Sequence, residues 1–193
     1  MTHILGIAGS LRDQSLNRWL LEAAREVAPE GVSIEIFDLG EIPLYNADLD
    51  SDGARPASVE RFKDALTATD ALLIATPEYN YTIPGVLQNA LDWASRPARR
   101  SPLSGKPVGI MGASPGSIGT ARAQEHLKLV LLAALALPLP HGGVVVGDAL
   151  RKFDETGTLV DEPTRRFLAD YVQQLAAWAR RVGAPAEAVQ AVG

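Results

Sequence analysis

Several kinds of chemistry are excluded because this sequence lacks the residues that they need. It contains no cysteine, which removes disulfides, thiolate catalysis and cysteine-ligated zinc or iron–sulfur centres together. Of its three histidines, neither His126 nor His141 has a partner at the spacing of metal ligands, so no metal site is expected. A net charge of −5 and the lack of a basic stripe argue against a nucleic-acid partner. Any redox chemistry must therefore use a bound organic cofactor.

Long apolar segments are also missing. The longest run, residues 129–137, is too short to span a bilayer, and Met1-Thr2-His3 lacks the charged region of a signal peptide. We therefore expect a cytoplasmic protein without a membrane span. With 47% hydrophobic and 21% charged residues, the composition is that of a globular protein. A chain of 193 residues suffices for one domain with a buried core, with only the small-residue tail 184–193 expected to be frayed.

The rest of the chain alternates between strand and helix patterns. Near-continuous apolar runs at residues 4–8, 71–75 and 108–111 predict parallel strands buried on both faces. A polar–apolar alternation at residues 32–37 predicts an edge strand, and a short valine run at residues 144–146 predicts the last strand. Apolar residues at helical spacing predict helices at about residues 15–28, 58–67, 84–94, 120–135 and 163–181. Five strands alternating with five helices predict an α/β three-layer sandwich with a parallel sheet of order 2-1-3-4-5.

A polar loop, residues 9–17, follows the first predicted strand and leads into the first helix. The N–H groups in the first turn of a helix lack partners within it, and the helix dipole adds partial positive charge there. Ser10 and Ser15 add hydroxyls, Asn17 an amide, and Arg12 a charge that can bind two oxygens. The loop lacks the lysine of a Walker loop and the glycines of a dinucleotide fingerprint. It predicts a phosphate site, although a plain turn capped by Ser15 would use the same residues.

Two further unusual loops, residues 77–84 and 114–120, follow the third and fourth predicted strands. The carboxyl ends of parallel strands meet at one edge, so all three loops should lie together. The second loop offers a proline, two tyrosines and an amide, which suit a flat heteroaromatic ring. The third contains Gly116 and Gly119, which let a backbone approach closely. A phosphate at the first loop and a ring between the other two indicate a mononucleotide of the flavin type.

These motifs, taken in order, resemble the NADPH-dependent FMN reductase family, a flavodoxin-like group that includes bacterial quinone, chromate and azo-dye reductases. The resemblance covers nearly the whole chain. It is carried by Gly9-Ser10-Leu11-Arg12-x-x-Ser15-x-Asn17, by Pro77-Glu78-Tyr79-Asn80-x-x-Ile83-Pro84-Gly85-x-Leu87-x-Asn89-Ala90-x-Asp92-Trp93, and by Ser114-x-Gly116-x-x-Gly119-Thr120-x-Arg122. Two positions depart from the family pattern: Gln88 stands where lysine is frequent, and Thr120 where glycine is frequent.

The resemblance implies noncovalent FMN and assigns its site. The phosphate would lie on Ser10, Arg12, Ser15, the Leu16 N–H and Asn17, and the ring on Pro77, Glu78, Tyr79 and Asn80, with Ser114 and Gly116 on the third side. NADPH or NADH would be the co-substrate, and a homodimer or homotetramer the assembly. No catalytic side chain is assigned, because the flavin carries the chemistry. Glu78 is expected to hold its loop rather than act as an acid, and the two loop tyrosines either stack on substrate or cap the sheet edge.

The predicted function is hydride transfer from NAD(P)H through flavin N5 to a quinone, a flavin or a similar small-molecule acceptor, in a ping-pong cycle. The competing hypothesis is a flavodoxin-type electron carrier that binds FMN but does not oxidise NAD(P)H directly. Such carriers tend to be much more acidic than a chain of net charge −5, which favours the enzyme. A mononucleotide-binding regulator without a redox role is a third hypothesis, with no positive support.

Overall fold

A computed structural model describes residues 1–51 and 53–183 of the protein. Residues 184–193, for which a frayed tail is predicted, lie outside the described residues. The described strands are β1 (Thr2–Ala8), β2 (Val32–Phe37), β3 (Ala71–Ala75), β4 (Pro107–Ala113), β5 (Leu137–Pro138) and β6 (Val144–Val146). The α-helices are α1 (Leu16–Glu26), α2 (Ala57–Ala68), α3 (Gly85–Ala94), α4 (Ala121–Ala133) and α5 (Glu162–Gly183), and two single-turn 3₁₀ helices are η1 (Ala47–Leu49) and η2 (Ala149–Arg151).

The strands form one parallel sheet in the order β2-β1-β3-β4-β5, with β6 also paired to β4. The predicted order 2-1-3-4-5 is therefore confirmed. The predicted count of five strands is wrong, because the fifth position is shared by two short strands. β5 pairs with Pro107 and Val108, whereas β6 pairs with the far end of β4, from Met111 to Ala113. The chain between them, with Pro140 and two glycines, leaves the line of the sheet.

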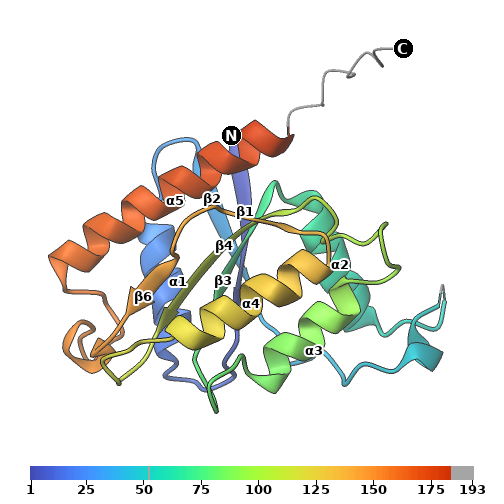
Figure 1. Cartoon of the computed structure of the whole chain (residues 1–193), viewed down its shortest axis with the longest axis horizontal. Coiled ribbons are helices and arrows are strands. Elements are labelled where there is room, and N and C mark those ends of the chain that lie inside the picture. The colour runs from blue at the N-terminus through green and yellow to red at the C-terminus, as the bar shows by residue number, and fades with distance from the viewer. Residues whose placement is uncertain (52, 184–193) are drawn as a thin grey trace.

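Helices cover both faces of the sheet, giving the predicted three layers (Figure 1). One core cluster joins α1 and α5 to the sheet, and a second joins α2, α3 and α4 to the opposite face. Strand residues alternate between the clusters with a period of two: in β3, Leu73 belongs to the first cluster, whereas Leu72 and Ile74 belong to the second. This double burial explains why the central strands read as continuous apolar runs.

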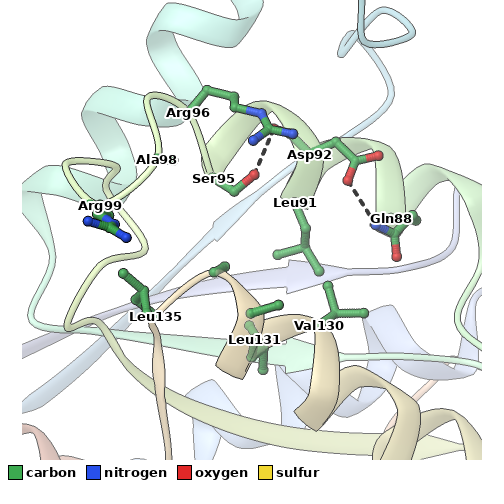
Figure 2. Close-up of a pocket in the computed structure, with 12 residues that line it drawn as sticks. Gln88, Leu91, Asp92, Ser95, Arg96, Ala98, Arg99, Val130, Leu131 and Leu135 are labelled. Carbon is green, nitrogen blue, oxygen red and sulfur yellow. Dashed lines mark hydrogen bonds between the residues drawn. The ribbon is translucent and has the colours of Figure 1, made fainter.

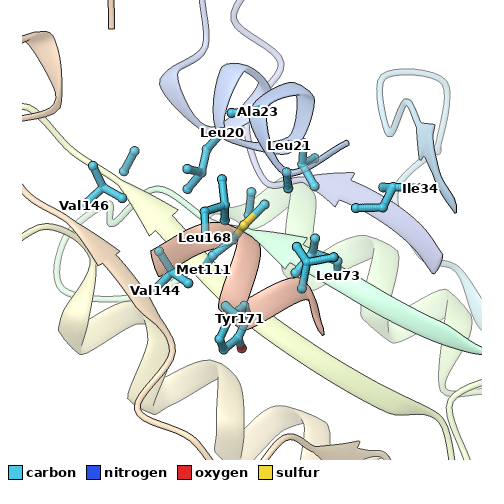
Figure 3. Packing of buried hydrophobic residues seen from close by; sticks show 14 of the residues in the cluster. Leu20, Leu21, Ala23, Ile34, Leu73, Met111, Val144, Val146, Leu168 and Tyr171 are labelled. Atoms are coloured by element: carbon cyan, nitrogen blue, oxygen red, sulfur yellow. The ribbon is translucent and has the colours of Figure 1, made fainter. Parts of the chain in front are cut away.

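Tyr171 of α5 completes the sheet where the fifth position is interrupted. β4 has ladder partners at Val108 and Met111 but none on that side at the residues between them. The N–H of Ile110 donates instead to the Tyr171 hydroxyl at 2.7 Å. Figure 3 shows Tyr171 in the cluster with Met111 and Leu168. Burial raises the pKa of the Tyr171 phenol to about 12, so the hydroxyl remains neutral at physiological pH.

The parallel registers bring the ends of β1, β3 and β4 to one edge. Ala8 pairs with Ala75, and Ala75 in turn pairs with Met111, so the loops that follow these strands start side by side. Among the described residues, no helix combines the length and the apolar character needed to cross a lipid bilayer.

Candidate functional site

The three predicted loops meet at the carboxyl edge of the sheet, as expected (Figure 1). The Gly9 N–H donates to the Ala75 carbonyl at 2.9 Å. A Cβ added to Gly9 would lie 3.3 Å from both Pro77 and Leu87, which places the first loop against the second. The third loop is tied to the first by Asn17, whose amide bonds the end of β4. Groups from all three loops can therefore contact one ligand.

The first loop presents polar groups that the protein itself does not satisfy. Ser15 is the N-cap of α1, and its hydroxyl accepts the Arg18 N–H at 3.3 Å. Within the described ranges, the main-chain N–H groups of Leu16 and Asn17 have no hydrogen-bond partner. The Arg12 guanidinium is exposed and has no ion pair there either. The capped turn and the phosphate site are thus compatible readings of the same residues.

Two side chains near the first loop are committed elsewhere. The Arg18 guanidinium lies 3.0 Å from Asp38, whose pKa is lowered chiefly by the Gly40 N–H and further by Arg18. The Asn17 side chain is 3% exposed and bonds Ala113 twice, donating to its carbonyl at 3.0 Å and accepting its N–H at 2.9 Å. The Asn17 amide, which was expected to add to the phosphate site, is thus bonded to β4 instead, and the group of Asn17 that remains for phosphate is its main-chain N–H.

The second loop contains a tight turn at residues 79–82. Tyr79 and Thr82 exchange hydrogen bonds of 3.0 and 3.1 Å, and both central residues, Asn80 and Tyr81, have positive φ (52° and 66°). This is the pattern of a type I′ turn, in which glycine is usual at the second central position. Pro77 is buried at the base of the loop, and the rings of Tyr79 and Tyr81 are exposed. The turn leaves the Asn80 N–H without a partner among the described residues.

Glu78 fastens the second loop to α4. Its carboxylate accepts the main-chain N–H groups of Arg122 and Ala123, at 3.0 and 3.1 Å, and lies 3.2 Å from the Arg122 guanidinium. The N-cap residue Thr120 makes no side-chain cap, so Glu78 caps the helix from a distant loop. The expectation that Glu78 holds its loop is confirmed. A second attachment follows at the end of the loop, where Thr82 is hydrogen-bonded to the His126 ring.

The third loop is held mainly by its own main chain and by a segment that sequence reasoning missed. The Ser114 hydroxyl accepts the Gly116 N–H at 3.2 Å. The segment 147–149, after β6, donates from Asp148 to the Gly116 carbonyl and from Ala149 to the Ser114 carbonyl. Nothing in its sequence distinguishes it from an ordinary surface turn, so only the pairing of β6 with β4 reveals its place.

The two glycines of the third loop differ in their roles. Gly119 has φ +65°, and a side chain there would collide with Val145. The fold itself therefore requires that glycine. A Cβ at Gly116 would meet only the Ser114 hydroxyl, at 3.7 Å, so the protein's own packing does not demand a glycine there. Gly116 stays a candidate for close approach to a ligand, as predicted.

A separate cavity of about 560 Å³ lies between the carboxyl halves of α3 and α4 (Figure 2). Leu91, Val130 and Leu131 form an apolar part of its lining, and Arg96 and Arg99 lie toward one end. It is not the predicted site, because the second and third loops join the opposite, amino-terminal ends of α3 and α4.

Comparison with known proteins gives a consistent family match. Residues 2–151 match the sequence profile described as NADPH-dependent FMN reductase. The chain is 49% identical over 179 residues to an NAD(P)H-dependent FMN reductase of Pseudomonas aeruginosa, covering 93% of this chain and 96% of the relative. It is 39% identical over 176 residues to a quinone reductase of Pseudomonas putida, covering 90% of this chain and 92% of the relative.

A solved structure agrees in fold as well as in sequence. FerB, described as a flavoenzyme NAD(P)H:(acceptor) oxidoreductase from Paracoccus denitrificans, superposes with a TM-score of 0.85 at 35% sequence identity. The match covers 94% of this chain and 98% of that chain. The parallel order 2-1-3-4-5 is therefore shared over nearly the full length of both proteins.

Proposed function

Because this chain belongs to the NADPH-dependent FMN reductase family, we propose that it is an FMN-containing enzyme that oxidises NAD(P)H and reduces a quinone, a flavin or a similar small acceptor. The relatives named FMN reductase and quinone reductase support both halves of this reaction. The observation in this chain that carries the proposal is the set of polar groups at the first loop that can still donate a hydrogen bond. Two main-chain N–H groups, the Ser15 hydroxyl and the Arg12 guanidinium together match the needs of a phosphate monoester.

The residues that would hold FMN fall into two sets. The phosphate set is Ser10, Arg12, Ser15 and the N–H groups of Leu16 and Asn17; the ring set is Pro77, Glu78, Tyr79, Asn80, Ser114 and Gly116. When bound, FMN would supply the two-electron redox chemistry between NAD(P)H and the acceptor. The chain binds and orients the cofactor.

Within the ring set, the roles follow from the contacts of each residue. The unpartnered Asn80 N–H is a preorganised dipole that would stabilise negative charge on the reduced ring. The Glu78 carboxylate is occupied by α4, which leaves water or the flavin to supply protons. No side chain of the site is assigned as a general acid or base.

The test is an absorption spectrum of the purified protein, repeated anaerobically after addition of NADPH or NADH. Flavin bands that bleach within seconds, and return on addition of a quinone, are the expected result. Bands that bleach only with dithionite would replace the proposal with the electron-carrier function. A protein that is colourless and takes up no added FMN would overturn the cofactor assignment.

We also infer that the chain assembles as a homodimer or homotetramer. α4 and the turn after it expose three leucines, Leu129, Leu132 and Leu135, with 66%, 57% and 50% of their surface accessible. Leu135 also lines the cavity of Figure 2, so the apolar surface continues there from α4 towards α3. A second copy presents the same surface and can cover it symmetrically. Light scattering should give a multiple of 20.5 kDa, and a monomer at every concentration would contradict the inference.

A further inference from the structure

Arg122 is the cationic side chain next to the ring-binding turn, and its position is unusually well fixed for an exposed arginine. Its guanidinium lies over the Tyr81 ring, 4.6 Å from the ring centre, and one of its nitrogens lies 3.2 Å from Glu78. The side chain is nevertheless 48% exposed. A guanidinium that is backed by an aromatic ring and fastened at one end keeps its remaining donors and its outer face open to solvent.

The fold does not require Tyr81 to be a tyrosine. It occupies a turn position with φ 66°, which glycine would adopt without strain, and its ring is 70% exposed. The contact that the structure gives this ring is with Arg122. Tyr81 therefore adds little to packing and has an unfavourable backbone conformation. Its contact with Arg122 explains the tyrosine better than a role in the core does.

The charge balance at this position stays positive. Glu78 opposes Arg122, but the same carboxylate already accepts two N–H groups at the start of α4, where the helix dipole contributes partial positive charge. The nearest other ionisable groups on α4 are Glu125, whose charge is balanced by Lys128 at 2.6 Å, and His126, whose ring is bonded to Thr82. An anion at the open side of Arg122 therefore meets a net attraction.

We propose that Arg122 selects the electron acceptor by binding planar acceptors that carry a negative charge, such as ionised hydroxyquinones and sulfonated quinones. The anionic group of the acceptor takes hydrogen bonds from the guanidinium N–H groups that Glu78 leaves free, while Tyr81 and Glu78 act as positioning residues. The inference rests on the proposed function and names its acceptor class. The overall reaction is unchanged: NAD(P)H, one proton and a quinone give NAD(P)⁺ and a hydroquinone, with two electrons transferred.

The experiment compares two acceptors with the same ring, 1,4-naphthoquinone and its 2-sulfonate, by stopped flow with anaerobically reduced FMN-loaded protein. In Arg122→Gln, the second-order rate constant for the sulfonate should fall about tenfold, as for loss of one charge-assisted hydrogen bond, and that for the neutral quinone less than about twofold. Arg122→Lys keeps the charge without the planar surface and should retain part of the preference. Tyr81→Leu should lower the preference for the sulfonate without abolishing it. Each ratio is taken within one variant, so partial loss of FMN cancels.

Arg181→Gln is the matched control, since it removes the same charge from the last turn of α5, where the neighbouring Arg180 bonds Thr2 at the opposite edge of the sheet. A ratio that does not change in Arg122→Gln, or that changes equally in Arg181→Gln, would overturn the inference. So would a defect confined to flavin reduction by NADPH, which would assign Arg122 to the co-substrate. If NADPH fails to reduce the wild type, dithionite-reduced protein is used, and an Arg122-dependent preference would then uphold the inference while the proposed NAD(P)H oxidation fails.

Discussion

The two loops that would hold opposite ends of one ligand differ in how completely the protein satisfies them. In residues 9–17, the cation Arg12 and the N–H groups of Leu16 and Asn17 have no partners within the described ranges. In residues 77–84, the turn is closed by its own hydrogen bonds, and Glu78 and Thr82 fasten it to α4. The first loop is built to gain bonds on binding, whereas the second is fixed beforehand.

This difference suggests that the first loop determines the affinity for FMN, whereas the second determines the orientation of its ring. Unpaired donors at a helix N-terminus gain charge-assisted bonds when a phosphate arrives, so the first loop should supply most of the binding free energy. A loop that is already rigid pays little ordering entropy and can hold a ring in one orientation. We therefore expect substitutions in the first loop to alter FMN affinity, and substitutions in the second to alter stability and ring placement.

The largest effect is expected from Asn17→Ala, and it would break the comparison between the two loops. Asn17 belongs to the first loop by position, but its side chain is bonded to β4 and supports the fold. Asn17→Ala leaves the buried N–H and carbonyl of Ala113 without partners and should lower the free energy of unfolding of the apoprotein by about 3 kcal/mol. Urea unfolding measures this, with Gln14→Ala, an exposed change in the same loop, as the control. An unchanged apoprotein that only loses FMN would show that the amide acts on the ligand.

Arg12→Ala should sharpen the comparison from the other side. The exposed guanidinium supports nothing in the apoprotein, so its unfolding free energy should change by less than about 0.5 kcal/mol. FMN binding should weaken by about 1.5–3 kcal/mol, because a charged hydrogen bond to phosphate is lost. Fluorescence titration of the apoprotein with FMN measures the affinity, and Arg25→Ala, in the last turn of α1, is the control. Equal FMN affinities for Arg12→Ala and the wild type would mean that the loop has been misread.

Glu78→Ala should have the opposite effect to Arg12→Ala, because it should lower the stability of the apoprotein rather than the affinity for FMN. It removes the cap from α4 and releases the second loop, which should cost about 1–2 kcal/mol of stability with or without FMN. Glu78→Gln keeps an oxygen that can accept the two N–H groups and should recover much of the loss. Thermal and urea unfolding of both variants measure the effect. If Glu78→Gln proves as unstable as Glu78→Ala, the ion pair with Arg122 matters more than the cap.

The smallest effect is expected at Tyr81. Tyr81→Gly relieves the positive φ but loses the ring contact with Arg122, and these opposing changes should leave the unfolding free energy within about 0.5 kcal/mol of the wild type. Tyr81→Val keeps the strain without the ring and should cost more than about 1 kcal/mol. Urea unfolding of Tyr81→Gly and Tyr81→Val separates the cost of the positive φ from the contribution of the ring contact. A Tyr81→Gly variant as unstable as Tyr81→Val would show that the ring contributes to stability rather than being held at a cost.

The fold was largely predictable because burial on two faces leaves a strong sequence pattern. The observed bounds of β2, β3 and β6 coincide with the predicted runs, and the strand order followed from the alternation of strands and helices. β5 could not be predicted. Its two residues, Leu137 and Pro138, carry no periodicity and are defined only by pairing with β4.

The site was predictable in its location but not in its internal bonds. The three loops follow from topology, and the capping role of Ser15 follows from its place before a helix. The partner of Asn17 lies 96 residues away, and an asparagine at this position serves equally as a cap, a ligand or a bridge. The capping of α4 by Glu78 spans 44 residues and has no local signal. Such long-range side-chain bonds depend on tertiary packing, which spacing alone does not reveal.

The bond between Ile110 and the Tyr171 hydroxyl makes completion of the sheet depend on the last described helix to leave the ribosome. Until α5 is synthesised, the Ile110 N–H lies in the gap between β5 and β6 without its partner. Once α5 has docked, its tyrosine closes that gap. The Ile110 amide proton should then exchange with solvent only when α5 leaves the sheet, so the helix and the central strand unfold as one cooperative unit.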